Sequence, residues 1–181
     1  MDNNKTTGEL LIDKFHEFTS ENITSVEALK ETLEAYNNVL KGLLDERMFI
    51  ASHLEISDEI LQKEFEQTGK IANEVLAKSN ATINKMPLIL QNQDEKYLAL
   101  FTSQEEIKKN TNTGVNCAEV IYTTEAYEAV VKNEYFNGIV INPFGLEFII
   151  DNEHLEYLLK GCPEEEFQMD LEKVLAELKS N

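Results

Sequence analysis

The chain has 181 residues, and its 34 Asp and Glu residues against 16 Lys and Arg residues give a formal net charge of −18 at pH 7. The only arginine is Arg47, so the chain lacks the cationic surface that binds nucleic acid or an anionic membrane. A hydrophobic content of 42% is that of a folded protein, and at this length we expect one main domain.

The start of the chain does not resemble a secretory signal, because residues 1–8 are polar and the stretch that follows is amphipathic. The longest apolar stretch, residues 139–150, is interrupted by polar residues and a proline, so no segment is long enough to span a membrane. Cys117 and Cys162 are too few and too far apart in sequence for a disulfide framework. We therefore expect a soluble, cytoplasmic protein with reduced thiols.

A first long helix is predicted over residues 24–45. Thr24 and Glu27 have the spacing of a capping box, which satisfies free amides at a helix start. Apolar side chains then recur every three or four residues and share one face: Val26, Leu29, Leu33, Tyr36, Leu40 and Leu43. Packing against a core explains this face, and a coiled-coil or partner-binding seam is the alternative. Upstream, residues 1–22 are expected to form a tail with a short helix around Leu11, Phe15 and Phe18.

A strand over residues 47–54 is predicted next, followed by a helix over residues 57–77. Ser57 is the candidate cap of this helix, and apolar residues keep helical spacing from Leu61 onward. Gly69 lies inside this stretch, where a glycine weakens a helix by about 1 kcal/mol relative to alanine.

From Met86 onward, short β-rich pieces alternate with turn residues. Strands 86–91 and 97–101 are expected to form an antiparallel hairpin. A short helix, capped by Thr102 or Ser103, then runs through Lys109. Strand 118–122 and helix 124–132 follow. If the strands at either end of residues 118–142 are parallel neighbours, their connection must be a right-handed crossover.

A second hairpin is predicted from strands 138–142 and 146–150. Its connection, Asn142-Pro143-Phe144-Gly145, has the residues that a type I turn favours at its first, second and fourth positions. A closing helix follows at residues 152–160. The expected fold class is α/β (α+β): a mixed sheet of about five or six strands with two hairpins and flanking helices.

The predicted organisation is a tail over residues 1–22, a domain over residues 23–160 and an acidic amphipathic helix over residues 161–181 that packs on the domain. Gly161 ends the preceding helix, and Pro163 suits the first turn of the next one. The apolar stripe of this last helix comprises Phe167, Leu171, Val174 and Leu178.

No catalytic, metal-binding or cofactor-binding motif is found in the sequence. His16, His53 and His154 lie in separate predicted elements and lack zinc-binding spacing. Phosphate-binding loops, nucleophile elbows and calcium loops are also missing from the sequence. Helix capping explains Thr102 and Ser103, and Cys117 would be a nucleophile only if folding brought a base against it. We expect no cofactor and no metal.

Two segments resemble the SseB N-terminal domain family, which is named for a bacterial enhanced-serine-sensitivity protein. They are YLALFTS at residues 97–103 and GIVINPFG at residues 138–145, within a resemblance that covers about residues 26–160. The resemblance implies an α/β bacterial cytoplasmic domain without an established activity and without catalytic residues to carry over. The helix predicted over residues 57–77 is longer than the connection expected in that family, and beyond Lys160 we expect one helix in place of a second domain.

Three functional hypotheses follow from the sequence. The first is a non-catalytic binding or regulatory module for a protein partner or a second copy, with a site made of Phe101, Thr102, Asn142, Pro143, Phe144 and Gly145. Phe144 is either displayed on the surface or folded back onto the core. The second is a hydrolase or transferase acting on a small molecule, with Cys117, His154 or Asn142 gathered in a pocket. The third is an acidic assembly or immunity-type protein that meets a basic partner.

Overall fold

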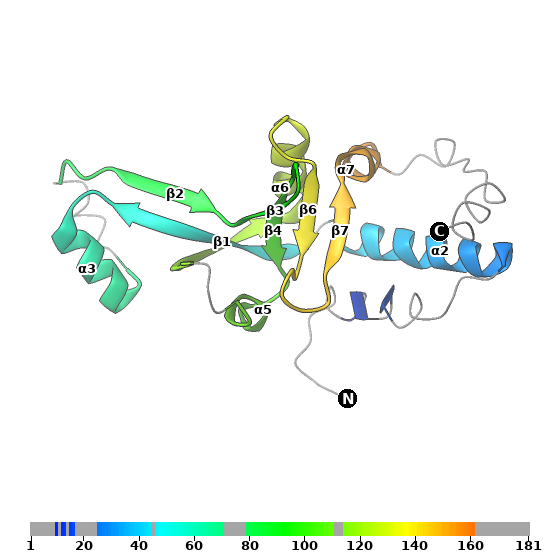
Figure 1. The fold of residues 1–181 in the computed structure, drawn as a ribbon, viewed down its shortest axis with the longest axis horizontal. Coiled ribbons are helices and arrows are strands. Elements are labelled where there is room, and N and C mark those ends of the chain that lie inside the picture. Colours follow the sequence, from blue (N-terminus) through cyan, green and yellow to red (C-terminus); the bar gives the residue numbers. More distant parts are fainter. Residues whose placement is uncertain are drawn as a thin grey trace.

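The computed structural model describes residues 10, 12, 13, 15, 16, 25–44, 46–70, 79–110 and 114–161. Within this part of the chain, one mixed sheet of seven strands is flanked by helices (Figure 1). The helices are α2 (Val26–Gly42), α3 (Glu59–Thr68), α5 (Gln104–Lys108), α6 (Thr123–Val131) and α7 (Asn152–Leu159). The strands are β1 (Arg47–Ile56), β2 (Ile83–Pro87), β3 (Ile89–Asn92), β4 (Glu95–Phe101), β5 (Cys117–Tyr122), β6 (Gly138–Ile141) and β7 (Phe148–Asp151). The predicted α+β class is confirmed, with more strands than the five or six expected.

The sheet is ordered β2-β1-β4-β6-β7, with β3 also paired to β4 and β5 also paired to β1. The β4–β6 pair is parallel and every other pair is antiparallel. Both predicted hairpins are present, as β3–β4 and β6–β7. β5 and β6 are not neighbours, because β1 and β4 lie between them, so the connection between parallel neighbours runs instead from β4 to β6.

The additional strand arises where a single strand was predicted over residues 86–91. The chain changes partner at Leu88, whose N–H donates to the Ala51 carbonyl at 2.8 Å and whose carbonyl accepts from the Ala99 N–H at 3.0 Å. Before Leu88, β2 pairs with β1, and after it β3 pairs with β4. One extended run therefore serves two partner strands, because β1 and β4 pair over only a short stretch at Phe49 and Ile50.

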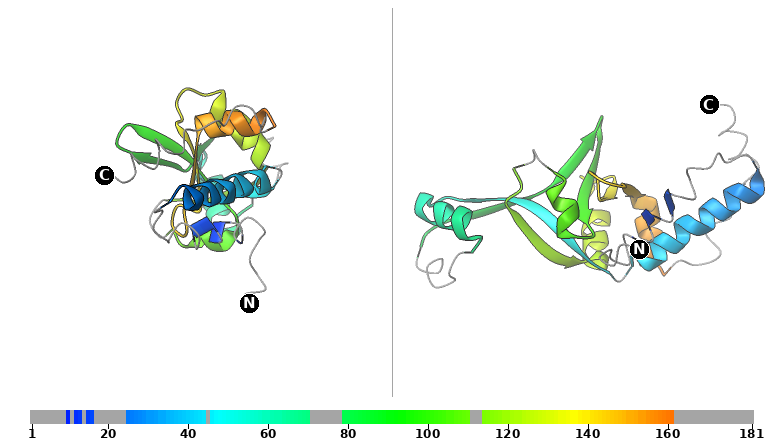
Figure 2. Two further views of the ribbon diagram at one scale, coloured as in Figure 1. Left: turned by 90° about the vertical axis from the view of Figure 1, so that its right-hand side faces the viewer. Right: turned by 90° about the horizontal axis from the view of Figure 1, so that it is seen from below.

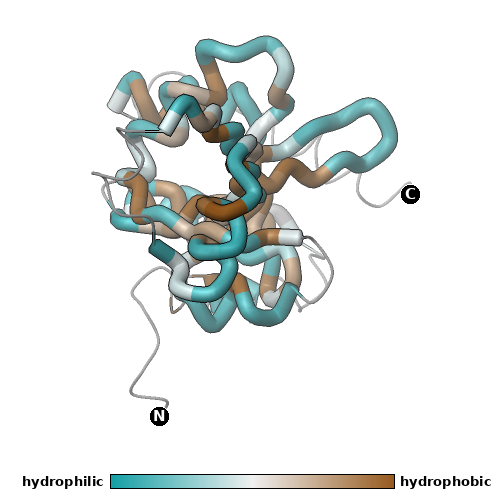
Figure 3. The backbone as a smooth tube through the Cα atoms, turned by 90° about the vertical axis from the view of Figure 1, so that its left-hand side faces the viewer, coloured by the Kyte–Doolittle hydropathy of each residue, from teal (hydrophilic) through white to brown (hydrophobic). Residues whose placement is uncertain are grey.

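The main hydrophobic core lies on one face of the sheet, under α2, α6 and α7. Its largest fully buried side chains include Leu40 and Leu43 of α2, Tyr127 of α6, Ile139 and Ile141 of β6, and Leu155 and Leu158 of α7. A smaller cluster on the opposite face, called the second face below, contains Ala51, Ala99, Phe101 and Val140, with Ile107 of α5 packed against it. Hydrophobic segments gather toward the middle of the molecule, and hydrophilic ones lie in projecting loops (Figure 3).

The outer half of β1 extends away from this core together with β2 and α3. We call this part the arm; α2 projects on the opposite side of the sheet (Figures 1 and 2). The arm has its own small apolar cluster of Ile56, Leu61 and Phe65. The helix predicted over residues 57–77 is shorter in the structure, because α3 ends at Thr68 and Gly69 caps it with φ 67°. Residues 71–78 lie outside the described part of the chain.

Two of the predicted helix caps are one residue out of place. Asp58, and not Ser57, caps α3, and the Ser57 hydroxyl accepts instead from the Thr82 N–H. Ser25 caps α2 by accepting from the Ala28 N–H, and Ser103 caps α5 as one of the two predicted candidates.

The predicted segments at the two ends of the chain fall largely outside the described residues. Near the N-terminus, Ile12 is helical and buried and Phe15 is helical, whereas Leu11 and Phe18 are not described. Of the helix predicted over residues 161–181, only Gly161 is described. None of the described helices is long and apolar enough to cross a membrane.

Candidate binding surface

The turn that joins β6 to β7 is held to the end of β4 by buried hydrogen bonds. The Gly145 N–H donates to the Asn142 carbonyl at 2.9 Å, which closes the predicted turn, and the Asn142 N–H donates to the Leu100 carbonyl at 2.9 Å. The Asn142 Oδ1 accepts from the Thr102 N–H at 3.0 Å, and the Asn142 Nδ2 donates to the Thr102 hydroxyl at 2.9 Å. Both side chains are buried. We call this arrangement the Asn142–Thr102 latch.

Asn142 has φ 51°, in the left-handed region that asparagine tolerates better than most residues. Gly145 lies close to α5, since a Cβ there would meet the ends of two flexible side chains, 2.5 Å from a Glu106 carboxylate oxygen and 3.1 Å from the Lys109 Nζ. Glu106 and Lys109 form an ion pair on α5. The turn is therefore packed closely against α5 as well as against β4.

Phe144, at the tip of this turn, is part buried and part exposed. Its ring stacks on that of Phe101, with centroids 6.2 Å apart and an interplanar angle of 23°. Phe101 is fully buried, whereas Phe144 is 36% exposed. The side chain thus contributes to the second face and still presents apolar surface to solvent, which combines the two alternatives that the sequence left open.

The strand register extends this apolar surface across the sheet. Phe49 of β1 lies opposite Phe101 of β4, and Val120 of β5 lies opposite Phe49. Directly opposed residues of neighbouring strands share a face, so Val120, Phe49, Phe101 and Phe144 follow one another across the second face. We call these four residues the apolar band. Its two ends are exposed, Val120 to 59% and Phe144 to 36%, whereas Phe101 between them is fully buried.

The end of the band at β5 is bordered by Tyr122 and Arg47. The Arg47 Nη2 donates to the Tyr122 hydroxyl at 2.7 Å, and the guanidinium carbon lies 5.0 Å from the centre of the Tyr122 ring. Tyr122 is 44% exposed. Phe49, Val120 and Tyr122 were not among the predicted site residues, because their strands are readable in the sequence but the register that aligns them is not.

The residues proposed for an enzymatic site lie on separate elements. Cys117 begins β5, Asn142 follows β6, and β1 and β4 lie between those strands. At about 4.8 Å per strand spacing, this separation is about 14 Å, far beyond hydrogen-bond reach. Burial, and then the Glu119 carboxylate, raise the pKa of the Cys117 thiol, which opposes formation of a nucleophilic thiolate.

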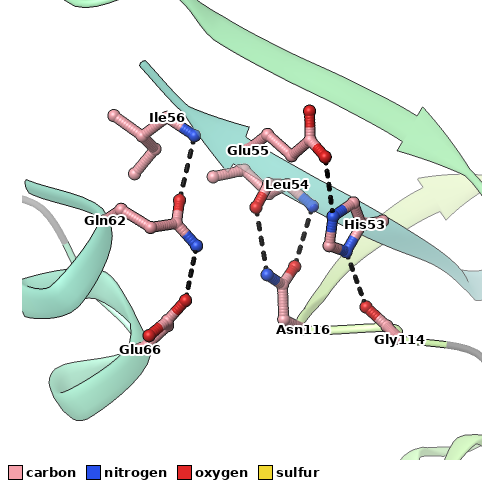
Figure 4. Close-up of polar contacts among 8 residues, drawn as sticks. All are labelled: His53, Leu54, Glu55, Ile56, Gln62, Glu66, Gly114 and Asn116. Carbon is pink, nitrogen blue, oxygen red and sulfur yellow. Dashed lines mark hydrogen bonds and ion pairs between the residues drawn. The ribbon is translucent and has the colours of Figure 1, made fainter. Parts of the chain in front are cut away.

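The histidines have structural partners. The His154 Nδ1 lies 2.7 Å from the Asp151 carboxylate, and its ring packs edge-on against Tyr36. The His53 Nδ1 lies 2.7 Å from the Gly114 carbonyl at the base of the arm (Figure 4). The described residues contain no group of three or more His, Cys, Asp and Glu side chains that could hold a metal ion.

Comparison with known proteins identifies one family. The sequence profile of the SseB protein N-terminal domain matches residues 24–156, which include α2, the arm, both hairpins and the apolar band. No curated protein and no solved structure shows significant similarity to the chain.

Proposed function

Because the chain belongs to the SseB protein N-terminal domain family, we propose that it is a non-catalytic binding or regulatory module of the bacterial cytoplasm. Its partner in this proposal is another protein, bound without a cofactor through the turn at residues 142–145 and the apolar band. A net charge of −18 disfavours nucleic acid and anionic membranes as alternatives.

The observation that carries this proposal is that the Phe144 ring is held in place and is still partly exposed to solvent. Its ring is held by stacking on a fully buried phenylalanine, and the backbone beneath it is held by the Asn142–Thr102 latch. An aromatic side chain that is already ordered loses little conformational entropy on binding, so its apolar surface contributes more fully to affinity.

The predicted site residues divide into two roles in this proposal. Phe144 and Pro143 contact the partner, because they lie at the tip of the turn and are not fully buried. Asn142, Thr102 and Phe101 are buried and position that tip. Gly145 allows α5 to approach, and α5 contributes charged side chains such as Glu105 and Lys108 to a polar rim of the kind that surrounds the apolar centre of protein interfaces.

A test of the proposal is affinity capture of partners from the native cell lysate, followed by mass spectrometry of the retained proteins. The bait is the full chain, the variant Phe144→Ser, or the control Ile60→Ser. Ile60 is 78% exposed on α3, so it is an apolar surface residue outside the band. We expect the same partner to be retained by the wild type and by Ile60→Ser and to be lost from Phe144→Ser.

Equal retention by Phe144→Ser and the wild type would contradict the proposed surface. Thermal unfolding of the three proteins should show that both variants remain folded. The capture is repeated at low and high salt, because an apolar interface tolerates salt whereas an interface made of exposed charges weakens.

A further inference from the structure

Within the described part of the chain β5 pairs with β1 alone, which makes it an edge strand of the sheet. The Thr123 N–H donates to the Glu46 carbonyl, and the Asn116 N–H donates to the Ser52 carbonyl, so the even-numbered residues of β1 direct their backbone groups toward β5. By the register of this pair, Cys117, Glu119 and Ile121 bond to β1. The backbone groups of Ala118 and Val120 therefore point away from the sheet.

Two other edges of the sheet are covered by side chains. On β7, the Tyr36 hydroxyl donates to the Ile149 carbonyl at 3.3 Å, and the His16 Nε2 lies 2.7 Å from the Glu147 carbonyl. On β1 beyond the end of β5, the Asn116 side-chain amide bonds to both the N–H and the carbonyl of Leu54 (Figure 4). Covering an edge in this way prevents it from pairing with another chain.

The edges of β2 and β3 are protected by composition and length. The residues of β2 whose backbone groups point away from β1 include Lys85 and Pro87, and proline has no N–H to donate. β3 has only four residues and directs Gln91 outward. A charge, a proline and a short strand are all recognised ways to discourage edge-to-edge pairing.

β5 lacks most of these protections, since its one charged residue, Glu119, lies at a position whose backbone bonds to β1. It is six residues long, without proline, and its outward positions are the apolar Ala118 and Val120, followed by Tyr122. Among the described residues, no hydrogen bond is made to the outward backbone groups of Ala118 or Val120. The apolar band begins at this same strand, so an added strand would gain both backbone hydrogen bonds and an apolar surface to pack on.

We propose that β5 accepts an extended strand from a partner protein, with apolar side chains that continue the band on the second face and basic side chains on the other face. This inference rests on the proposed function and specifies its mode of binding. Strand addition of this kind obtains affinity from main-chain hydrogen bonds and specificity from alternate side chains.

A second copy of this chain and a basic strand from another protein are the two alternative partners for β5, and the net charge favours the basic strand. Two copies would each bring a charge of −18 to the contact, and their repulsion opposes pairing of β5 with itself. On the face opposite the band, β5 presents Glu119, whose side chain is 54% exposed and forms an ion pair with Lys85. The net charge of −18 therefore favours a strand with lysine or arginine at alternate positions as the occupant.

The probe is a short peptide of alternating lysine and valine, blocked at both ends, titrated into the full chain. A second peptide has the same side chains with alternate backbone nitrogens methylated, and a third replaces lysine with glutamate. We expect the first peptide to slow hydrogen exchange at the amides of Ala118 and Val120. The other two should bind at least about tenfold more weakly, since one lacks the backbone donors and the other has the wrong charge.

The matched variants are Val120→Pro and Val120→Ile. The N–H of Val120 points outward, so proline removes a donor from the free edge and leaves the β1 ladder intact. We expect about a fivefold rise in Kd for Val120→Pro, which Val120→Ile should not show, because isoleucine keeps the N–H, the β-branching and the apolar side chain. Equal binding of the methylated and unmethylated peptides overturns strand addition, and this comparison needs no variant to fold.

Retention of the captured partner by the Val120 and Phe144 variants distinguishes failure of this inference from failure of the proposed function. If Val120→Pro retains the partner as well as the wild type does while Phe144→Ser loses it, strand addition is wrong and the binding function stands. If both variants lose the partner and Val120→Ile retains it, both proposals are supported. If both variants retain it, both are wrong.

Discussion

Asn142 combines a positive φ with a buried side chain whose polar atoms are shared with Thr102. The sequence pattern Asn-Pro-x-Gly predicted the turn, but it assigned Asn142 only the usual role of a first turn residue. In the structure, the same residue also connects the end of β6 to the end of β4 by hydrogen bonds, although these strands are distant in sequence. The position of Phe144 therefore depends on a hydrogen-bond network that is not local.

Two substitutions separate the contributions of Asn142. Both Asn142→Gly and Asn142→Ala remove the hydrogen bonds to Thr102, with an expected loss of about 2 kcal/mol in the free energy of unfolding. Asn142→Ala should lose about 1 kcal/mol more, because alanine is strained at positive φ and glycine is not. Urea unfolding measures both values, and Asn84→Ala on the exposed part of β2 should change stability by no more than about 0.5 kcal/mol. Equal stability of the alanine and glycine variants would contradict the strain at this position.

At the scale of elements, the arm is joined to the sheet by polar side chains at its base. β1 continues past the end of β5, and there Asn116 bonds to Leu54 while Gln62 accepts from the Ile56 N–H at 2.9 Å (Figure 4). A two-stranded ribbon is barely stable by itself in water. The packing of Leu61 and Phe65 of α3 on Ile56 and these side-chain contacts explain why β1 and β2 stay paired so far from the main core.

His53 connects the base of the arm to the loop before β5, and its titration tests that connection. The pKa of His53 is raised above 6.5, chiefly by its hydrogen bond to the Gly114 carbonyl; burial opposes this increase, and the hydrogen bond and charge of Glu55 add smaller increases. Because the folded-state pKa is the higher one, the stabilising contribution is complete below the unfolded-state pKa and is lost as pH rises through the folded-state pKa.

The imidazole proton resonances of His53 should accordingly titrate with a midpoint above 6.5. The stability difference between the wild type and His53→Gln, measured by urea unfolding at several pH values, should shrink as pH rises through that midpoint. A difference that grows with pH, or a midpoint below the ordinary value, would show that these contacts do not persist in solution.

At the scale of the whole molecule, the charge is the dominant feature. Part of the acidity stabilises helix starts, since Glu27, Glu59, Glu105, Glu125 and Glu153 each lie in the first turn of a helix. The described part of the molecule is an elongated body with the arm on one side and α2 on the other (Figure 2). The excess of negative charge reduces stability through self-repulsion and favours basic partners over acidic ones.

Salt should therefore stabilise the protein. At about 0.1 M ionic strength the screening length is about 10 Å, which weakens repulsion between separated carboxylates more than it weakens close contacts. We expect Tm to rise between a low-salt buffer and about 0.2 M NaCl, measured by calorimetry at neutral pH. KCl should give the same increase if screening is the cause, whereas an unchanged or lower Tm would show that repulsion does not limit stability.

Much of the local structure could be predicted from the sequence, because its determinants are short-range. Apolar periodicity located α2, the capping residue Ser103 located the start of α5, and Asn-Pro-x-Gly located the β6–β7 turn. The errors also have local causes: Gly69 ends α3 where periodicity alone continued the helix, and Asp58 replaced the neighbouring Ser57 as its cap.

The amino-acid sequence by itself determined the acidic character of the protein, its α+β class, both hairpins and the turn that carries Phe144. Only the tertiary structure decided that Leu88 divides one extended run between β1 and β4, that Val120 and Phe49 align with Phe101, and that β5 has no second partner strand among the described residues. The physical reason is that helix periods, caps and turns depend on residues a few positions apart. Strand partners and register depend on contacts between distant segments, which many pairings of similar apolar strands would satisfy equally well.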